Sequence, residues 1–279
     1  MKNYLCKNLK INGKDFTWGK KTYLMGIINL TPDSFSGDGV YKNENTDISK
    51  SIEQALYMID EGADILDIGG ESTRPGHSNI SDEEEIDRVI PFLTEIRKKT
   101  DIPISIDSSK AKVVEAALNE GANIINDVWG VRKNNPLFRL SAKYNVPIII
   151  MHNKNDKEYF HLMAEIISQL NISIIEARNA GVKEENIIVD PGIGFGKKYE
   201  HNLELIKNLD DFKILPYPLL LGPSRKSFIG LTLNLPENER LEGTIATISL
   251  GISKGTDIIR VHDVKEMYRV TRICDAICR

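Results

Sequence analysis

The chain has 279 residues, 41% of them hydrophobic, and a formal net charge of −4 at pH 7. This length suits one domain with a large buried core, since a single barrel domain needs about 250 residues. The weakly acidic charge excludes a global attraction to nucleic acid or to an anionic membrane surface.

Three cysteines, Cys6, Cys274 and Cys278, form neither a CxxC pair nor a disulfide framework. The N-terminus lacks the continuous apolar segment of a signal peptide, and no apolar run reaches the roughly 18 residues of a membrane span. We therefore expect a cytoplasmic protein whose partners are small molecules.

The first 20 residues carry a hairpin signal. Leu9-Lys10-Ile11 and Phe16-Thr17-Trp18 flank Asn12-Gly13-Lys14-Asp15, and an Asn-Gly pair favours the positive φ that a tight turn requires. This predicts an N-terminal β-hairpin over residues 1–20 that covers the bottom of the main domain and belongs to it.

Eight apolar runs rich in Ile, Val and Leu follow, and a helical stretch comes after nearly every one. They span residues 23–30, 63–70, 102–108, 122–128, 146–152, 186–191, 218–223 and 256–262. Such runs are typical of strands covered on both faces, as in a parallel sheet inside a ring of helices. Eight units predict an α/β fold, a (β/α)8 TIM barrel, over residues 21–279.

Between the strands the chain shows helix signals. Ser81 precedes an acidic run that reaches Asp87, and we expect it to cap a helix whose first turn is solvated. Further helices are predicted over residues 110–120, 136–145 and about 157–180. The long segments 31–47 and 71–82 follow the first two strands at the catalytic face of a barrel, so they are candidate lids.

Polar residues stand where the strands end. In chain order the ends present Asn29, Asp67, Asp107, Asn126, Met151, Asp190, Ser224 with Lys226, and Arg260 with His262. The acceptors Asp107, Asn126 and Asp190 suit a flat ring with several N–H donors, such as a pterin or a purine. The alternative for Asp107 and Asn126 is that each caps the following helix.

The cations at the same ends predict an anion site. Arg260 and His262 alternate onto one face of the last strand, Lys226 comes from the preceding unit, and Arg74 lies in the second long segment. The loops after strands seven and eight are the usual phosphate position in this fold. Phosphate or pyrophosphate is therefore the expected anion.

The segment Gly192-Ile193-Gly194-Phe195-Gly196-Lys197 resembles a phosphate loop but fails the Walker pattern, because Pro191 stands where that pattern needs Gly. Its glycines predict a tight loop after Asp190. Phe195 either lies against a ligand ring or anchors the loop, and His152 is expected to be a core or supporting residue rather than a metal ligand.

At these residues the chain resembles the dihydropteroate synthase family of pterin-binding enzymes. The matching blocks are Gly26-Ile27-Ile28-Asn29-Leu30-Thr31-Pro32-Asp33-Ser34-Phe35-Ser36, Asp67-Ile68-Gly69-Gly70-Glu71-Ser72-Thr73-Arg74-Pro75-Gly76, Ser105-Ile106-Asp107, Ile125-Asn126-Asp127, Met151-His152, Asp190-Pro191-Gly192-Ile193-Gly194-Phe195, Ser224-Arg225-Lys226-Ser227 and Arg260-Val261-His262-Asp263. The resemblance implies condensation of p-aminobenzoate with a dihydropterin methyl diphosphate in folate biosynthesis.

The resemblance also implies site residues. It puts the pterin on Asp107, Asn126, Met151, Asp190, Phe195, Lys226 and Arg260; pyrophosphate on Asn29, Thr73, Arg260 and His262; and p-aminobenzoate beside Thr73, Arg74, Pro75, Ser224 and Phe195. Lys226, Arg260 and Asp107 are the implied catalytic residues, and Mg2+ is implied near Asn29. A homodimer is expected, because C-terminal helices often pair subunits in this family.

Three alternatives remain open at this point. A methyltransferase acting from methyltetrahydrofolate to a corrinoid protein would share the ring acceptors, but it would not need the cations Lys226, Arg260 and His262. An aldolase would use Lys226 as a Schiff-base lysine. A non-catalytic pterin-binding paralogue would keep every ring contact and lack turnover.

Overall fold

The computed structural model describes residues 2–31, 48–71 and 80–279. Asp33, Thr73, Arg74 and Pro75 therefore lie outside the described residues, and so does most of each candidate lid. Hairpin strands β1 (Asn8–Ile11) and β2 (Lys14–Thr17) pair antiparallel and form a sheet of their own. The predicted hairpin is confirmed.

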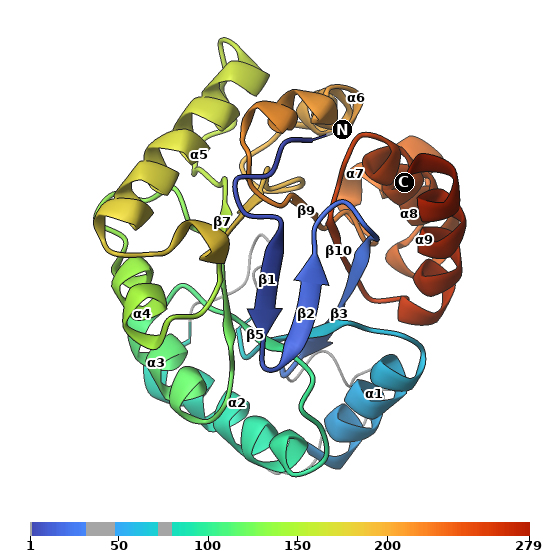
Figure 1. Ribbon diagram of the computed structural model, residues 1–279. Helices are drawn as coiled ribbons and strands as arrows, with labels where there is room; N and C mark the ends of the chain where they lie inside the picture. Colours follow the sequence, from blue (N-terminus) through green and yellow to red (C-terminus); the bar gives the residue numbers. More distant parts are fainter. Residues whose placement is uncertain (1, 32–47, 72–79) are drawn as a thin grey trace.

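Eight parallel strands form the second sheet, and each of the eight predicted runs contains one of them (Figure 1). They are β3 (Tyr23–Asn29), β4 (Ile65–Gly69), β5 (Ile104–Asp107), β6 (Ile124–Asp127), β7 (Ile148–Met151), β8 (Ile187–Asp190), β9 (Leu220–Leu221) and β10 (Ile258–Val261). Their order is β8-β7-β6-β5-β4-β3-β10-β9, and a parallel bridge between Val189 and Leu219 joins the two ends. The predicted barrel is confirmed.

Helices surround this sheet in Figure 1. They are α1 (Ile48–Asp60), α2 (Asp82–Arg97), α3 (Ala111–Asn119), α4 (Pro136–Tyr144), α5 (Leu162–Asn179), α6 (Tyr199–Lys207), α7 (Ser227–Leu233), α8 (Leu241–Ser253) and α9 (Val264–Cys278), with short 3-10 helices η2 (Glu184–Asn186), η3 (Leu209–Ile214) and η4 (Glu237–Glu239). Within the described ranges, no helix combines the length and the apolar character that a bilayer crossing requires.

Two helix predictions need correction. Helix α5 begins at Leu162 rather than near residue 157, because Glu165 accepts hydrogen bonds from the backbone N–H groups of Phe160 and His161 and holds the preceding residues outside the helix. Ser81 caps α2 as predicted, through its side-chain oxygen and the N–H of Glu84. The first turn is only partly solvated, however, because Glu85 is fully buried.

The strands alternate between two environments because side chains two positions apart on a strand point to the same side. One set, which includes Leu66, Ile125 and Val189, packs outward against the helices in the main hydrophobic core. The inward set nearest the hairpin is also apolar and comprises Met25, Ile65, Ile124, Ile149, Ile188, Leu220 and Ile258. Two residues further along stand Ile27, Asp67, Asn126, Met151, Asp190, Gly222 and Arg260, so the barrel interior becomes polar toward the carboxyl ends.

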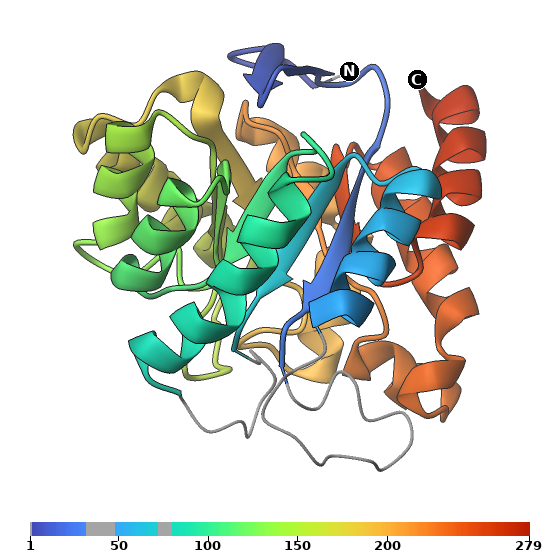
Figure 2. The ribbon, with the colours of Figure 1, turned by 90° about the horizontal axis from the view of Figure 1, so that it is seen from below.

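The hairpin closes the opposite, amino-terminal end of the barrel, and the strands run away from it in Figure 2. Phe16 and Trp18 are 2% and 1% exposed and pack with the inward apolar residues. The ring centroids of Phe16 and Tyr23 are 4.6 Å apart, and those of Trp18 and Tyr23 are 5.4 Å apart. The hairpin therefore acts as an apolar plug.

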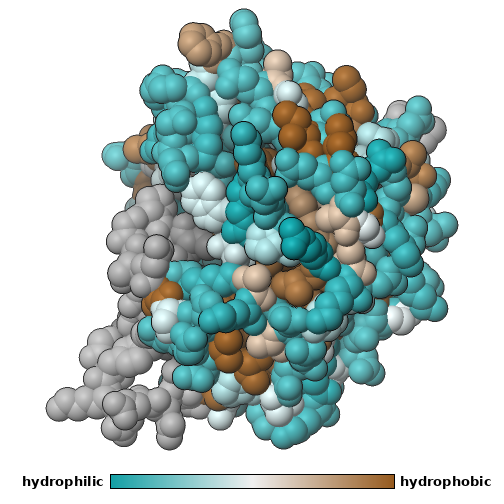
Figure 3. Space-filling model, turned by 90° about the vertical axis from the view of Figure 1, so that its left-hand side faces the viewer, coloured by the Kyte–Doolittle hydropathy of each residue, from teal (hydrophilic) through white to brown (hydrophobic). Residues whose placement is uncertain are grey.

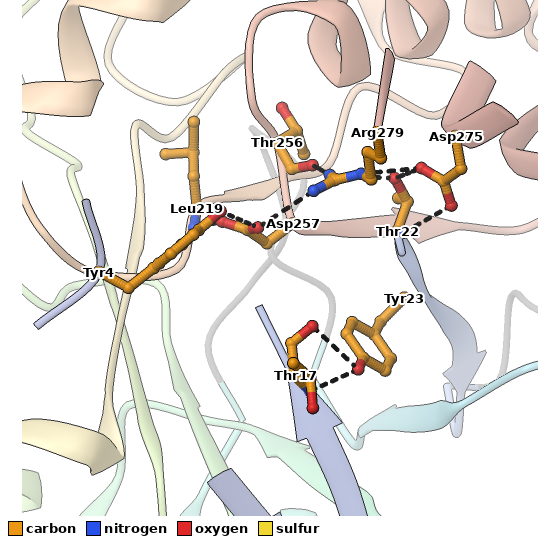
Figure 4. A network of polar contacts seen from close by, with 9 residues as sticks. All are labelled: Tyr4, Thr17, Thr22, Tyr23, Leu219, Thr256, Asp257, Asp275 and Arg279. Atoms are coloured by element: carbon orange, nitrogen blue, oxygen red, sulfur yellow. Dashed lines mark hydrogen bonds and ion pairs between the residues drawn. The ribbon is translucent and has the colours of Figure 1, made fainter. Parts of the chain in front are cut away.

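A polar network ties the ends of the chain to this same side of the barrel (Figure 4). Buried Asp257 accepts hydrogen bonds from the Tyr4 hydroxyl at 2.6 Å and from the backbone N–H of Leu219 at 3.0 Å. Asp275 of α9 accepts from both the backbone and the hydroxyl of Thr22 at 2.7 Å. These contacts anchor the hairpin segment and α9 against the barrel.

The side of the molecule that carries α4 and α5 is mainly hydrophilic, with its hydrophobic side chains in small groups (Figure 3). Ile172 and Ile175 of α5 are among the exposed apolar residues of the described chain. Small separated apolar groups are common on protein surfaces and do not by themselves indicate a partner.

Candidate active site

The polar groups predicted at the strand ends come together inside the carboxyl end of the barrel. Arg260 of β10 lies at the centre of this group: its Nε donates to Asp67 Oδ2 at 2.5 Å, and its Nη2 donates to Asp107 Oδ2 at 2.7 Å. Asn126 Nδ2 also donates to Asp67 Oδ2, at 3.1 Å. Two strands, β4 and β5, are thus tied to β10 through one guanidinium, and β6 joins the group through Asn126 and Asp67.

Burial and neighbouring charge act against each other in this group. Burial raises the pKa of Asp107, the charge of Arg260 opposes that shift, and the Asp67 carboxylate adds to it. For Arg260, burial disfavours the charged form, but the attraction of Asp67 and Asp107 outweighs it and raises its pKa. Arg260 is therefore a permanent cation, and burial raises the pKa of Asp107 even beside it.

One oxygen of Asp67 and one of Asp107, both Oδ1, are buried and have no hydrogen-bond partner among the described residues. Unpaired buried carboxylate oxygens are costly, so they are strong acceptors for a ligand that brings N–H groups. The Asp107 oxygen is available for such a ligand because Arg260 occupies only the other one. Neither Asp107 nor Asn126 caps the following helix, because the N-caps of α3 and α4 are Lys110 and Asn135.

We call this carboxyl end of the barrel, where the strand-end residues meet, the mouth. On its other side Asp190 ends β8 and is 6% exposed. Its Oδ1 accepts from the backbone N–H of Gly192 at 2.7 Å. Burial raises the pKa of Asp190, and the charge of Lys226 partly offsets this. Burial likewise lowers the pKa of Lys226 to about 7, with Asp190 opposing the shift. The charge of each group therefore opposes the pKa shift that burial causes in the other.

Lys226 lies against the loop of residues 191–197. Its Nζ donates to the carbonyl of Ile193 and lies 4.4 Å from the centroid of the Phe195 ring. Phe195 is a partly exposed residue, and its ring lies beside the lysine amine. This places an aromatic surface beside the amine, and it leaves both earlier interpretations of Phe195 compatible with the structure.

Ser224 and His262 form a further pair at the mouth. The Ser224 hydroxyl lies 3.0 Å from His262 Nδ1, and the backbone N–H of His262 donates to Ser224 Oγ at 3.3 Å. Arg225 turns away from this pair and donates to Asp263 through Nε at 3.0 Å. Arg225 is therefore engaged in an ion pair, whereas His262 remains at the mouth.

The remaining described candidates lie on the inward positions of their strands. Asn29 is the last residue of β3 and is partly exposed, and Met151 ends β7 and is 3% exposed. Thr73, Arg74 and Pro75 fall outside the described residues. Among the described residues, no group of three or more His, Cys, Asp or Glu side chains is arranged to hold a metal ion.

Sequence reasoning missed several residues that support the site. Asp67 received no binding role, although a carboxylate inside the apolar run Ile65-Leu66-Asp67-Ile68 signals a buried cation partner. Lys110 was also missed: its Nζ lies 2.9 Å from Glu71 and from Glu85, and it donates to the Ile80 carbonyl at 2.8 Å. The sequence hints at this role only through the position of Lys110, directly after the strand end Asp107-Ser108-Ser109.

Comparisons with known proteins agree with this geometry. Residues 25–262 match the family model described as pterin binding enzyme. A dihydropteroate synthase of Clostridium beijerinckii is 53% identical over 272 residues, which cover 97% of this chain and all of the relative.

Two solved structures are similar throughout. A dihydropteroate synthase from Clostridium difficile, solved in the presence of pteroic acid, has a TM-score of 0.89 and 49% identity, and the match covers 95% of this chain and 99% of that one. A dihydropteroate synthase from Xanthomonas albilineans, solved with 4-aminobenzoic acid, has a TM-score of 0.90 and 36% identity over 97% of this chain and 98% of that one. None of these relatives is named as a methyltransferase or an aldolase. The chain belongs to the pterin-binding enzymes and, within them, to the dihydropteroate synthases.

Proposed function

We propose that this chain condenses p-aminobenzoate with (7,8-dihydropterin-6-yl)methyl diphosphate to give 7,8-dihydropteroate and pyrophosphate, a step of folate biosynthesis. The observation that carries this proposal is the meeting of ring acceptors and cations in one mouth, where Arg260 contacts Asp67 and Asp107, and Lys226 and Asp190 interact electrostatically. The ligands of the related structures, pteroic acid and 4-aminobenzoic acid, correspond to the two halves of the product.

The pterin lies among the buried acceptors of this mouth. Asp107, Asn126 and Asp190 are 6%, 3% and 6% exposed, and they supply carboxylate and amide groups to the N–H edge of the ring. Met151 lines the pocket with an apolar, polarisable surface. Lys226 and Arg260 complete the set and balance the carboxylates.

The diphosphate lies over the cationic part of the mouth, on Asn29, Thr73, Arg260 and His262. A Mg2+ ion fits beside Asn29, because magnesium is usually held by one or two protein oxygens, with substrate phosphates and water as its other ligands. Asn29 is a partly exposed residue with a side-chain amide oxygen, which suits that pattern. When bound, the ion offsets charge on the diphosphate.

p-Aminobenzoate lies toward the outer mouth, beside Ser224, Phe195, Thr73, Arg74 and Pro75. The Phe195 ring supplies an aromatic contact, and the Ser224 hydroxyl is a donor for a carboxylate. The aryl amine then points inward to the pterin methylene.

The reaction proceeds by departure of the leaving group first. The methylene C–O bond breaks, pyrophosphate leaves with the electron pair, and the aryl amine forms the new C–N bond and loses a proton to solvent. Arg260 and His262 stabilise the leaving anion, while the carboxyl groups of Asp107 and Asp190 stabilise positive charge that spreads into the ring. The electrophile is reactive enough that no Ser or Cys nucleophile is required.

The assembly we propose is a homodimer of single-domain subunits in the cytoplasm. Large apolar side chains are exposed on the C-terminal helices: Leu231 of α7 (68%), Leu250 of α8 (53%), and Ile273 (63%) and Ile277 (79%) of α9. Exposed apolar side chains on adjacent helices support a subunit contact there. Sedimentation velocity measures the state directly.

Release of pyrophosphate, measured with both substrates present, tests the proposed reaction. Activity that needs p-aminobenzoate and the diphosphate together is expected, and tight pterin binding without turnover would instead identify a non-catalytic paralogue. Calorimetric titration of the pterin diphosphate with and without Mg2+ tests the metal. Asp190→Ala should weaken pterin binding by about 1–3 kcal/mol, whereas Arg260→Ala should mainly weaken binding of the diphosphate.

A further inference from the structure

The loop of residues 191–197 is held tightly against the barrel. Gly192 has a φ of +68°, and a Cβ there would lie 1.9 Å from the carbonyl oxygen of His152. The backbone N–H of Gly194 donates to Asn202 Oδ1 at 2.6 Å. The loop backbone is therefore packed closely against the barrel. Its position depends on the few groups that bind its carbonyls.

Lys197 is the main group inside this loop. It is 5% exposed, and its Nζ donates to the carbonyls of Gly192 at 2.8 Å and Phe195 at 3.0 Å. The same Nζ lies 3.1 Å from His152 Nδ1. Burial, followed by the nearby charge of Lys197, lowers the pKa of His152 to about 3, so His152 is neutral and Nδ1 is available as an acceptor.

Lys226 reaches the loop from the other side. Lys197 binds the carbonyls of residues 192 and 195, and Lys226 binds the carbonyl of Ile193 between them. The ring of Phe195, whose carbonyl Lys197 holds, lies 4.4 Å from Lys226 Nζ. Two buried lysines thus share one short loop, but only Lys226 faces the proposed substrates.

We propose that Lys197 is a positioning residue for p-aminobenzoate: by binding the carbonyls of Gly192 and Phe195, it holds the Phe195 ring at the mouth beside Lys226. The inference rests on the proposed function, because it takes Phe195 as the aromatic contact of that substrate. If Lys197 only stabilised the fold, its replacement would lower the thermal stability of the protein and leave the KM for p-aminobenzoate unchanged.

Lys197→Met tests this inference, since methionine keeps the apolar stem and removes the donor. The matched control is Lys198→Met, which changes the neighbouring exposed lysine whose Nζ pairs with Glu158 at 2.7 Å. Initial rates are measured against p-aminobenzoate at saturating pterin diphosphate. Loss of the two hydrogen bonds to the loop carbonyls should raise the KM for p-aminobenzoate about 10-fold or more in Lys197→Met, with kcat changed by less than about 3-fold. The control should stay within about 2-fold of the wild type.

A double-mutant cycle with Phe195→Ala tests the route. Phe195→Ala should itself raise the KM, and adding Lys197→Met to it should change the KM by less than about 2-fold, because the ring to be positioned is then absent. Independent, multiplicative effects would overturn the inference. If Lys197→Met does not fold, Lys197→Gln keeps one donor and should give an intermediate KM, and an unchanged KM in that variant would also overturn it.

The two proposals fail differently. A wild-type protein that releases no pyrophosphate would contradict the proposed function. An active wild type together with an unchanged KM in Lys197→Met would contradict only the role of Lys197.

Discussion

Arg260 and Asp67 are 193 positions apart in the sequence, and Arg260 Nε lies 2.5 Å from Asp67 Oδ2. Asp67 is fully buried, and the side chain of Arg260 is 20% exposed. Asp67 thus balances the charge of Arg260, and its Oδ2 also accepts a hydrogen bond from Asn126 Nδ2 at 3.1 Å. One buried carboxylate therefore orients two residues that we place in the pterin site.

Asp67→Asn should lower the free energy of unfolding by about 2–4 kcal/mol, because it removes the charge of one partner from a buried ion pair. Urea denaturation measures this change. Glu115→Gln is the control: Glu115 pairs with Lys143 at 2.6 Å on the surface, where such a pair contributes about 0–1 kcal/mol. Equal losses in the two variants would show that the Asp67 contact is not an important ion pair.

Lys226→Met should make the protein more stable and less active. Burial lowers the pKa of Lys226 from 10.5 to about 7, so between these values the unfolded chain holds a proton that the folded protein lacks. The stability of the wild type therefore rises with pH across this window, and the penalty is fully present below pH 7. The variant should gain about 1–3 kcal/mol at or below pH 7, and the gain should shrink toward pH 10.5. A difference that is constant from pH 6 to 10 would contradict this assignment.

Lys110 holds the two ends of the segment between β4 and α2. It binds Glu71 and the Ile80 carbonyl, and Glu71 Oε1 accepts from the Ile80 N–H at 3.0 Å. Glu85 lies buried beside the same ammonium, and burial raises its pKa. Lys110→Met should therefore lower the free energy of unfolding by about 3 kcal/mol, since it leaves a buried carboxyl group unpaired.

The double variant Lys110→Met, Glu85→Gln should recover part of that loss, because no unpaired charge remains. Urea denaturation of the two single variants and the double variant completes the cycle. Strict additivity would show that Lys110 and Glu85 do not interact. Lys112→Met is the control, as Lys112 Nζ reaches its nearest acids only at 3.9 Å on the surface.

Trp18→Ala should lower the free energy of unfolding by about 3–5 kcal/mol, the usual cost of deleting a large buried ring. Trp18 is 1% exposed within the plug at the amino-terminal end of the barrel. The kinetic constants of the folded fraction should stay near those of the wild type, because the proposed site lies at the opposite end. A large change in KM for either substrate would contradict that separation of structure and function.

Much of the candidate site could be predicted from strand ends alone. Asp107, Asn126 and Asp190 are the inward residues at the ends of β5, β6 and β8, and the two-residue period of a strand is enough to put them on one side. The partners of these groups could not be predicted in the same way. Which carboxylate Arg260 contacts depends on the tilt and closure of the barrel.

The sequence by itself determined the eight strands, the hairpin turn and the chemical character of the mouth, because apolar runs, an Asn-Gly pair and strand-end residues are local signals. Only the tertiary structure decided that Glu85 is buried, that Lys197 turns into its own loop and that Asp67 balances Arg260. The physical reason is that burial and ion pairing arise from elements distant in the sequence, and their free energy exists only once those elements have packed together.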